Sequence, residues 1–207
     1  MGPTESVRTI RSNQEREAEV PESGPDRVLM DRIRDGDREA YQTLLERYWP
    51  PLVVYATGIV EGEDAAKDVV QDAFIRVWRR RSDWTPSGPV SAYLYRITRN
   101  LALNARRDRT AEMGRREKGA RDLLSAMPRN NPQDELAVSS LREEVEAAIA
   151  GLPDRRREAF VLSRFHGLSY SEIAEAMGIS TQTVANQMRA ALAQLRHVLA
   201  EHLDEVD

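Results

Sequence analysis

The feature that most constrains the fold lies near the C-terminus, where two short helical patterns are separated by a three-residue turn. Ser169 followed three residues later by Glu172 is the pattern of a capping box, so a helix is expected to begin there. Gly178 can end that helix, and Ser180 can cap the next one. The small side chain of Ala174 would let the two helices cross closely. This spacing predicts a helix-turn-helix, whose second helix enters the major groove of DNA.

The side chains expected on the exposed surface of this motif are of the types that read base edges. Glutamine and asparagine pair with adenine, and arginine pairs with guanine. The predicted DNA-reading set comprises Tyr170, Thr181, Gln182, Thr183, Asn186, Gln187 and Arg189. A plain helical hairpin that binds no DNA is the alternative for the same pattern.

Apolar residues recur at helical spacing through most of the chain, and no alternating strand pattern occurs. We therefore predict an all-α protein made of two small helical domains joined by a flexible linker, the second containing the helix-turn-helix. The predicted divisions are a disordered lead at 1–27, a helical domain at 28–109, a linker at 110–140 and the helix-turn-helix domain at 141–203.

Capping residues and prolines predict where helices begin and end in the first domain. Asp37 is expected to cap a helix that Pro50 and Pro51 break or kink before helix resumes to about residue 60. Asp64 is expected to cap the next helix, which carries an apolar pair every four residues. Both helices are therefore expected to pack one face on the domain core.

The helix predicted at 91–108 has an apolar face and a polar face. On a helical wheel the apolar sector contains Leu94, Ile97, Leu101 and Ala105. The opposite sector contains Arg96, Asn100, Asn104 and Arg107. Amides read base edges and guanidiniums hold phosphates, while Trp84 in the predicted loop 82–90 could stack on unpaired bases. We predict a nucleic-acid-binding face; an ordinary surface helix beside core aromatic residues is the alternative.

Charge is distributed unevenly along the chain, although the net charge is only −4. Residues 28–75 contain ten acidic and five basic residues, whereas residues 76–109 contain nine arginines and two aspartates. An acidic block followed by a basic block indicates two partners of opposite character. A chance run of solvated arginines is the alternative.

Composition argues against several other classes of protein. There is no cysteine, which excludes disulfides and cysteine-ligated zinc. The chain shows no phosphate-binding glycine loop and no nucleophile–base pair, so we predict no enzyme activity, no metal and no cofactor. His166, in a predicted turn, is expected to be a cap or surface residue. The lack of a long apolar run or a signal peptide predicts a cytoplasmic protein with no membrane span.

Four segments together resemble one protein family. The segment DAAKDVVQDAFIRVW (64–78) resembles the polymerase-binding segment of sigma-70 factors. The segment AYLYRITRNLALN (92–104) resembles the helix that reads the −10 promoter element in the extracytoplasmic-function (ECF) group. GLPDRRREAF (151–160) and GLSYSEIAEAMGIS (167–180) resemble that group's −35-reading module. The chain is thus similar to an RNA polymerase sigma factor of the ECF group.

The resemblance implies a protein that binds core RNA polymerase, recognises −10 and −35 promoter elements and promotes DNA opening. The residues implied to dock on the clamp helices of the largest polymerase subunit are Asp68, Gln71, Asp72 and Phe74. It implies that Asn100 and Asn104 meet the −10 element and that the loop 82–90 captures a flipped base; with the polar face of the helix, the predicted single-stranded −10 set is Trp84, Arg96, Asn100, Asn104 and Arg107. The helix-turn-helix set would read double-stranded −35 DNA, and its domain would bind the flap of the other large subunit. An anti-sigma protein is a possible further partner.

A stand-alone helix-turn-helix regulator that never binds polymerase is the main alternative, and it leaves the acidic face at 68–72 unexplained. An enzyme or a pure interaction protein are alternatives from other classes. The chain also departs from the family pattern, since Ala185, Asn186, Gln187 and Ala190 stand where many relatives carry arginine. We therefore expect weaker phosphate attraction and a −35 preference richer in A·T pairs.

Overall fold

The computed structural model describes residues 24–84, 88–119 and 145–204, and within these ranges all regular structure is helical. The first module contains α2 (Pro25–Arg34), α3 (Arg38–Thr57), α4 (Glu63–Arg79), the short 3-10 helix η1 (Arg81–Asp83) and α5 (Val90–Gly119). The second contains a helix at 145–150, α7 (Asp154–Arg164), α8 (Tyr170–Met177) and α9 (Thr181–Asp204). The all-α prediction is confirmed. The predicted lead and linker fall mostly at 1–23 and 120–144, outside the described residues.

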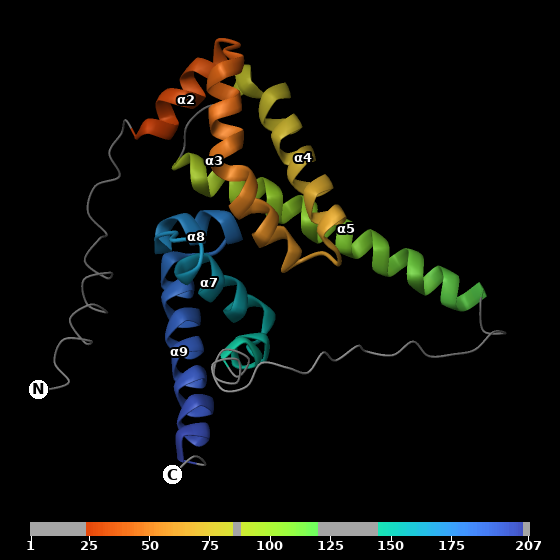
Figure 1. Cartoon of the computed structure of the whole chain (residues 1–207), viewed down its shortest axis with the longest axis vertical. Helices are drawn as coiled ribbons and strands as arrows, with labels where there is room; N and C mark the ends of the chain where they lie inside the picture. Colours follow the sequence, from red (N-terminus) through yellow and green to blue (C-terminus); the bar gives the residue numbers. More distant parts are fainter. Residues whose placement is uncertain (1–23, 85–87, 120–144, 205–207) are drawn as a thin grey trace, which may run out of the picture.

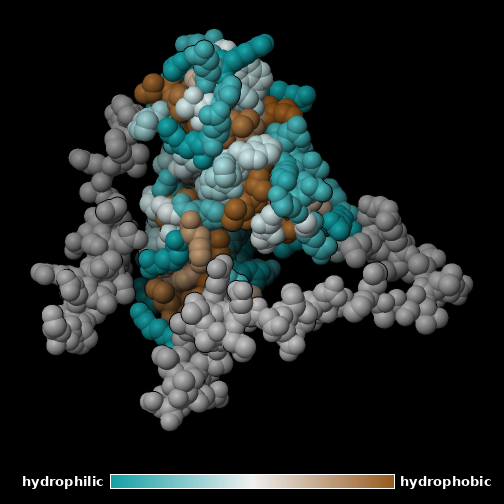
Figure 2. All heavy atoms as spheres, viewed as in Figure 1, coloured by the Kyte–Doolittle hydropathy of each residue, from teal (hydrophilic) through white to brown (hydrophobic). Residues whose placement is uncertain are grey.

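The two modules lie against each other, with α5 of the first module packed on α8 of the second (Figure 1). A continuous set of buried apolar side chains runs through both. On the face seen in Figure 2, brown apolar residues reach the surface in separate patches among teal hydrophilic ones. Within the described ranges, no helix combines the length and the apolar content needed to cross a membrane.

Asp37 caps α3 as predicted. Its carboxylate accepts hydrogen bonds from the backbone N–H groups of Ala40 (3.1 Å) and Glu39 (2.9 Å). The Ala40 hydrogen bond and the Arg32 guanidinium lower the pKa of this carboxyl below its ordinary value. The ion pair with Arg32 also ties the start of α3 to the end of α2.

Of the break or kink predicted at Pro50 and Pro51, the break is wrong, because α3 continues through both to Thr57. Each proline lacks a backbone N–H and so cannot donate to the preceding turn, which costs about 3 kcal/mol in a helix interior. Leu44 and Leu52, on either side of the pair, are both 0% exposed. Burying such a side chain contributes about 1.5–3 kcal/mol, so packing on the module core offsets much of the cost.

The prediction that Asp64 caps α4 is also wrong, since the helix begins at Glu63 and Gly62 occupies the cap position. Gly62 has φ +92°, a conformation that favours glycine. The apolar stripe itself is confirmed, with Ala66, Val69, Val70, Ala73, Phe74 and Val77 buried. α5 extends beyond its predicted end at Asp108 to Gly119, so the first part of the predicted linker is helical.

The helix-turn-helix is confirmed in its local details. The Ser169 hydroxyl accepts from the Glu172 backbone N–H (3.3 Å), and the Glu172 carboxylate accepts from the Ser169 N–H (2.8 Å). Gly178 ends α8 with φ +66°, and the Ser180 hydroxyl accepts from the Thr183 N–H (3.1 Å). The buried side chains of the two helices include Ile173, Ala174, Met177, Val184, Met188 and Leu195.

Candidate nucleic-acid interface

The polar face predicted on α5 is largely open to solvent. Asn100, Asn104 and Arg107 are exposed, while Leu94 and Leu101 on the other face are buried. Asn100 and Asn104 are four residues apart, so they lie about 6 Å apart along the helix axis, on successive turns. The helix therefore presents two amides and a guanidinium in a row.

Arg96, the first member of this row, is engaged by the second module. Its side chain is 39% exposed, and its Nη1 lies 3.6 Å from the Glu175 carboxylate of α8. Its guanidinium also lies over the Tyr93 ring, 5.7 Å from the ring centroid. In this arrangement Arg96 is only partly available to a DNA strand.

Trp84 does not lie on this face. It is 8% exposed and belongs to the buried core, so the prediction that it meets DNA is not supported by this conformation. The alternative given for it, a core aromatic residue, describes it better. Residues 85–87 of the predicted loop lie outside the described residues.

The start of α9 presents the predicted reading set. Thr181, Gln182, Asn186 and Arg189 are exposed, whereas Thr183 and Gln187 are partly buried, as is Tyr170 on α8. Asn186 Oδ1 accepts hydrogen bonds from Gln182 Nε2 (3.2 Å) and Arg189 Nη1 (3.0 Å). The polar side chains of the reading helix are thus linked to one another, with the Asn186 oxygen at the centre.

The three arginines at the start of α7 have different surroundings. Arg157 donates to the Ala150 and Leu152 carbonyls (2.8 and 3.2 Å) and pairs with Asp154 (2.7 Å). Arg156 donates to Gln194 Oε1 (3.3 Å), whereas Arg155 is exposed. The contacts of Arg157 hold the turn before α7 in place, which is a structural role.

The acidic face predicted on α4 is exposed at Asp68, Gln71 and Asp72. Phe74 is not part of it, because this side chain is 1% exposed and packs edge-on against the Tyr41 ring at 6.1 Å. The prediction that Phe74 contacts a partner directly is therefore wrong for this structure, since its helical position points into the core.

Sequence reasoning missed a neighbouring apolar site on the same helix. Ile75, one turn after Gln71, is 37% exposed although it is a large apolar residue. It opens onto a groove of about 600 Å³ between α3 and α4, lined by Arg38, Tyr41, Gln42, Leu45, Glu46, Ile75, Trp78 and Arg79. The signal in the sequence was that Ile75 falls outside the apolar pairs of this helix and lies at helical spacing from Gln71 and Asp72.

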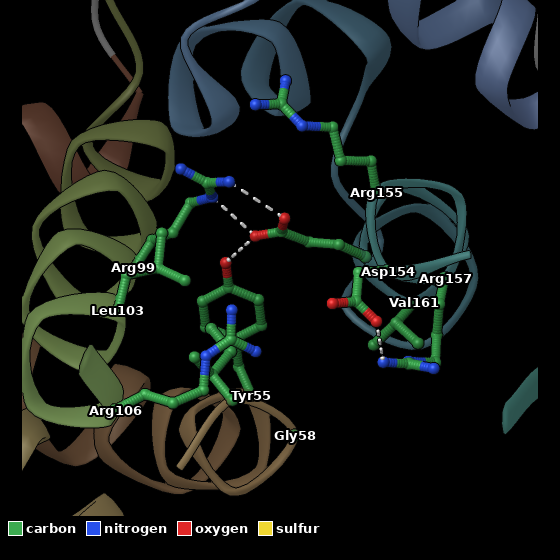
Figure 3. Close-up of a pocket in the computed structure, with 11 residues that line it drawn as sticks. Tyr55, Gly58, Arg99, Leu103, Arg106, Asp154, Arg155, Arg157 and Val161 are labelled. Carbon is green, nitrogen blue, oxygen red and sulfur yellow. Dashed lines mark hydrogen bonds and ion pairs between the residues drawn. The ribbon is translucent and has the colours of Figure 1, made fainter. Parts of the chain in front are cut away.

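A second cavity, of about 310 Å³, lies between the modules and is bordered by α3, α5 and α7 (Figure 3). Dashed lines in Figure 3 join Arg99 and the Tyr55 hydroxyl to one carboxylate, that of Glu158, and a separate one joins Arg157 to Asp154. Nearby, His166 is half-buried and contacts Tyr95, so the expectation of a cap or surface residue is wrong. No local pattern could have predicted these pairs.

The geometry so far defines a class of protein: a helix-turn-helix DNA-binding protein with a second helical module that offers its own polar, amide-bearing helix face. Comparison with known proteins is consistent with this class. Residues 44–112 match the family model for sigma-70 region 2, and residues 142–195 match the one for sigma-70 region 4.

Named relatives extend over both modules. The chain is 31% identical over 169 residues to the ECF RNA polymerase sigma-E factor of Escherichia coli strain K12, covering 79% of this chain and 88% of that protein. It is 36% identical over 149 residues to the ECF RNA polymerase sigma factor SigE of Mycolicibacterium smegmatis, covering 68% of this chain and 54% of the relative. The chain belongs to the sigma-70 family of RNA polymerase sigma factors, in its ECF group.

Solved structures share the fold. The structure of CnrH in complex with the cytosolic domain of CnrY aligns with a TM-score of 0.60 at 25% identity, covering 86% of this chain and 99% of that one. The sigma factor RpoE of Bartonella quintana, in complex with the anti-sigma factor NepR, aligns with a TM-score of 0.58 at 22% identity, covering 77% and 96%. Both alignments extend over most of the chain.

Proposed function

We propose that this sigma factor divides its work among three separate surfaces. The exposed face of α4 docks on core RNA polymerase, the polar face of α5 meets the −10 element, and the start of α9 reads the −35 element. The observation that carries the proposal is the exposure of Asn100 and Asn104 on one face of a helix whose other face is buried. Buried amides would have had no access to bases.

The polymerase-docking surface consists of Asp68, Gln71 and Asp72, with Ile75 at its apolar end. These side chains are exposed and follow one another at helical spacing, so they form one strip of α4. An interface usually combines an apolar centre with a polar rim. The groove beside Ile75 supplies the apolar part, and the carboxylates supply charge for basic residues of the clamp helices.

The −10 surface consists of Asn100, Asn104 and Arg107, joined by Arg96 when it leaves Glu175. Single-stranded bases expose their hydrogen-bonding edges, and the amides can pair with them, while the arginines attract phosphates. Extruding a base from the duplex costs a few kcal/mol, which contacts of this kind must offset. Trp84 has no part in the proposed surface because it is buried.

The −35 surface is the start of α9, inserted in the major groove. To hold adenine through two hydrogen bonds, Asn186 must present both its oxygen and its NH₂ group to the base. Its oxygen accepts from Gln182 and Arg189 in the free protein, so DNA binding would exchange at least one of these bonds. Arg189 is the cation within this set, and the amides of the set pair with adenine, whereas arginine pairs with guanine. We therefore infer a preference for A·T-rich −35 elements.

The proposed setting is the cytoplasm, where RNA polymerase and promoter DNA are found, and the proposed action involves no catalysis by the chain itself. The first domain, predicted at 28–109, would bind polymerase and open DNA, and the second, at 141–203, would read the −35 element and bind the flap. Solved relatives are complexes with CnrY and with the anti-sigma factor NepR, which supports a regulator of the same kind here.

The deciding experiment is run-off transcription of fragmented genomic DNA with purified core polymerase, with and without the full chain. We expect the chain to co-purify with core enzyme in a one-to-one ratio and to direct initiation at a small set of start sites that share two spaced elements. A chain that binds DNA but neither co-purifies with polymerase nor changes the start sites would be a stand-alone regulator, and the proposal would be abandoned.

A further inference from the structure

Polar side chains pair across the contact between the two modules, beside the apolar side chains that the modules bury together. Five pairs join residues of α3 and α5 to residues of the second module: Ser91 with Glu172, Tyr95 with His166, Arg96 with Glu175, Arg99 with Glu158, and Tyr55 with Glu158. We call this set the module contact. A partly buried polar pair stabilises the contact between the modules only while both partners are present and correctly charged, because a buried polar group without its partner costs free energy.

Glu158 is the centre of the module contact. It accepts two hydrogen bonds from Arg99, at 2.6 and 3.1 Å, and a third from the Tyr55 hydroxyl at 2.7 Å. The side chains of Arg99 and Glu158 are only 14% and 15% exposed. Burial, followed by the charge of Glu158, raises the pKa of Tyr55 well above its ordinary value, so this tyrosine remains a neutral donor.

His166 lies beside this centre, enclosed by aromatic rings of the first module. Its ring centroid is 5.4 Å from that of Tyr95 and 5.9 Å from that of Tyr55. Its Nδ1 is 3.0 Å from the Tyr95 hydroxyl. Its Nε2 is buried and has no hydrogen-bond partner among the described residues. A neutral imidazole needs one acceptor fewer than an imidazolium, so this site accommodates the neutral ring better.

We propose that the module contact is an acid-released latch, closed while the His166 imidazole is neutral and opened when it takes up a proton. Tyr55 on α3 and Tyr95 on α5 face this ring, and the charged groups of the surrounding module contact are Arg99 on α5, Glu158 on α7 and Glu172 on α8. Glu158 already accepts three hydrogen bonds from Arg99 and Tyr55, and Glu172 accepts from the Ser91 hydroxyl and the Ser169 N–H, so both carboxylates are engaged by other donors.

Proton linkage fixes the direction of the effect. Burial lowers the pKa of His166 in the closed state, whereas exposure in the open state returns it to about 6.5. The closed state therefore has its full stability when the pH is above the open-state pKa of His166. That stability is lost as the pH falls from the open-state pKa toward the lower closed-state pKa. One proton is taken up on opening, so the closed-to-open ratio falls by up to about tenfold per pH unit in this window.

Opening would release Arg96 from Glu175 and complete the polar row on α5. This consequence rests on the proposed function of that row, whereas the latch itself does not. The two can be tested separately, because the separation of the modules can be measured on the free protein without polymerase, DNA or transcription.

The test is energy transfer between two dyes on the full-length chain as the pH is lowered. The natural sequence has no cysteine, so Thr43→Cys on α3 and Ala193→Cys on α9, both at exposed positions, give one label on each module. We expect high transfer at pH 8 and a fall with a midpoint below about pH 6.5, while the helical circular dichroism signal stays constant. The latch would be refuted if energy transfer in the labelled protein without further substitutions did not fall with pH. It would also be refuted if the transfer fell together with the helical circular dichroism signal.

Three further variants identify the group responsible. His166→Gln keeps a hydrogen-bonding group toward Tyr95 but cannot titrate, and Glu158, Glu172 and Glu175 all remain in place. This variant should stay closed through the pH window, whereas His197→Gln, at an exposed position on α9, should open like the parent. Glu158→Gln should show low transfer even at pH 8. An unchanged acid transition in His166→Gln, or a closed Glu158→Gln protein, would overturn the proposal.

Discussion

Replacing both Asn100 and Asn104 by alanine tests whether α5 reads the −10 element. Both side chains are exposed, so their loss should change folding by no more than about 0.5 kcal/mol. Alanine also favours helix more than asparagine does, which should leave the melting temperature equal or slightly higher. An effect on transcription would therefore come from lost contacts to DNA and not from a damaged fold.

The size of the effect follows from the number of contacts removed. A good amide contact to a base edge is worth about 1–3 kcal/mol, so two such contacts give about 2–6 kcal/mol. At about 1.4 kcal/mol per decade, open-complex formation should fall between about 30-fold and 20,000-fold. The two residues are one turn apart and so can be coupled, and for this reason the double variant is compared with both single variants.

The assay is permanganate reactivity of unpaired thymines at a promoter chosen from the genomic run-off experiment, using polymerase reconstituted with each variant. Affinity for core polymerase, measured in parallel, should be unchanged. Thr43→Ala serves as a control, because this exposed hydroxyl on α3 donates to the Glu39 carbonyl of its own helix. The assignment of α5 to the −10 element would be refuted if the double variant opened the promoter normally. It would also be refuted if affinity for core polymerase fell as much as promoter opening did.

Three other predictions test the remaining surfaces and the fold. Asp68→Arg reverses a charge on the exposed face of α4 and should weaken the complex with core polymerase without changing the melting temperature; unaltered affinity would remove α4 from the interface. Gln187→Ala should shift the preference among −35 variants by about 1–3 kcal/mol, and an identical promoter profile would place this residue away from the bases. Ser169→Ala removes half of the capping box and should lower the free energy of unfolding by about 1 kcal/mol. Ser82→Ala, at an exposed position, is its control, and an equal loss there would contradict the capping argument.

Features set by neighbouring residues could be predicted closely. The capping box of Ser169 and Glu172, the left-handed Gly178 and the Asp37 cap each involve atoms within a few residues of one another. The side chain is the local hydrogen-bond partner for backbone groups that the helix end leaves free, so the sequence specifies the outcome. The polar row on α5 was predictable for a similar reason, because helical periodicity alone decides which residues share a face.

Predictions failed where distant packing outweighed a local preference. Helix continues through Pro50 because burial of Leu44 and Leu52 offsets the lost backbone bonds. Trp84 was predicted to stack on unpaired bases, yet its large apolar ring lowers its free energy most by joining the core. Phe74 carried the family's partner-binding pattern, but its position on α4 points inward.

The sequence by itself determined the helices, the helix-turn-helix and the amide-bearing faces, since these depend on periodicity and on contacts within a turn or two. Only the tertiary structure decided that Arg99 meets Glu158 and that Tyr95 encloses His166, pairs separated by 59 and 71 residues. The helix α5 carries both arginines and asparagines at regular spacing, and nothing local distinguishes those that face a carboxylate of the other module from those that face solvent. That difference arises when two helices with no sequence relation pack together and exclude water between them.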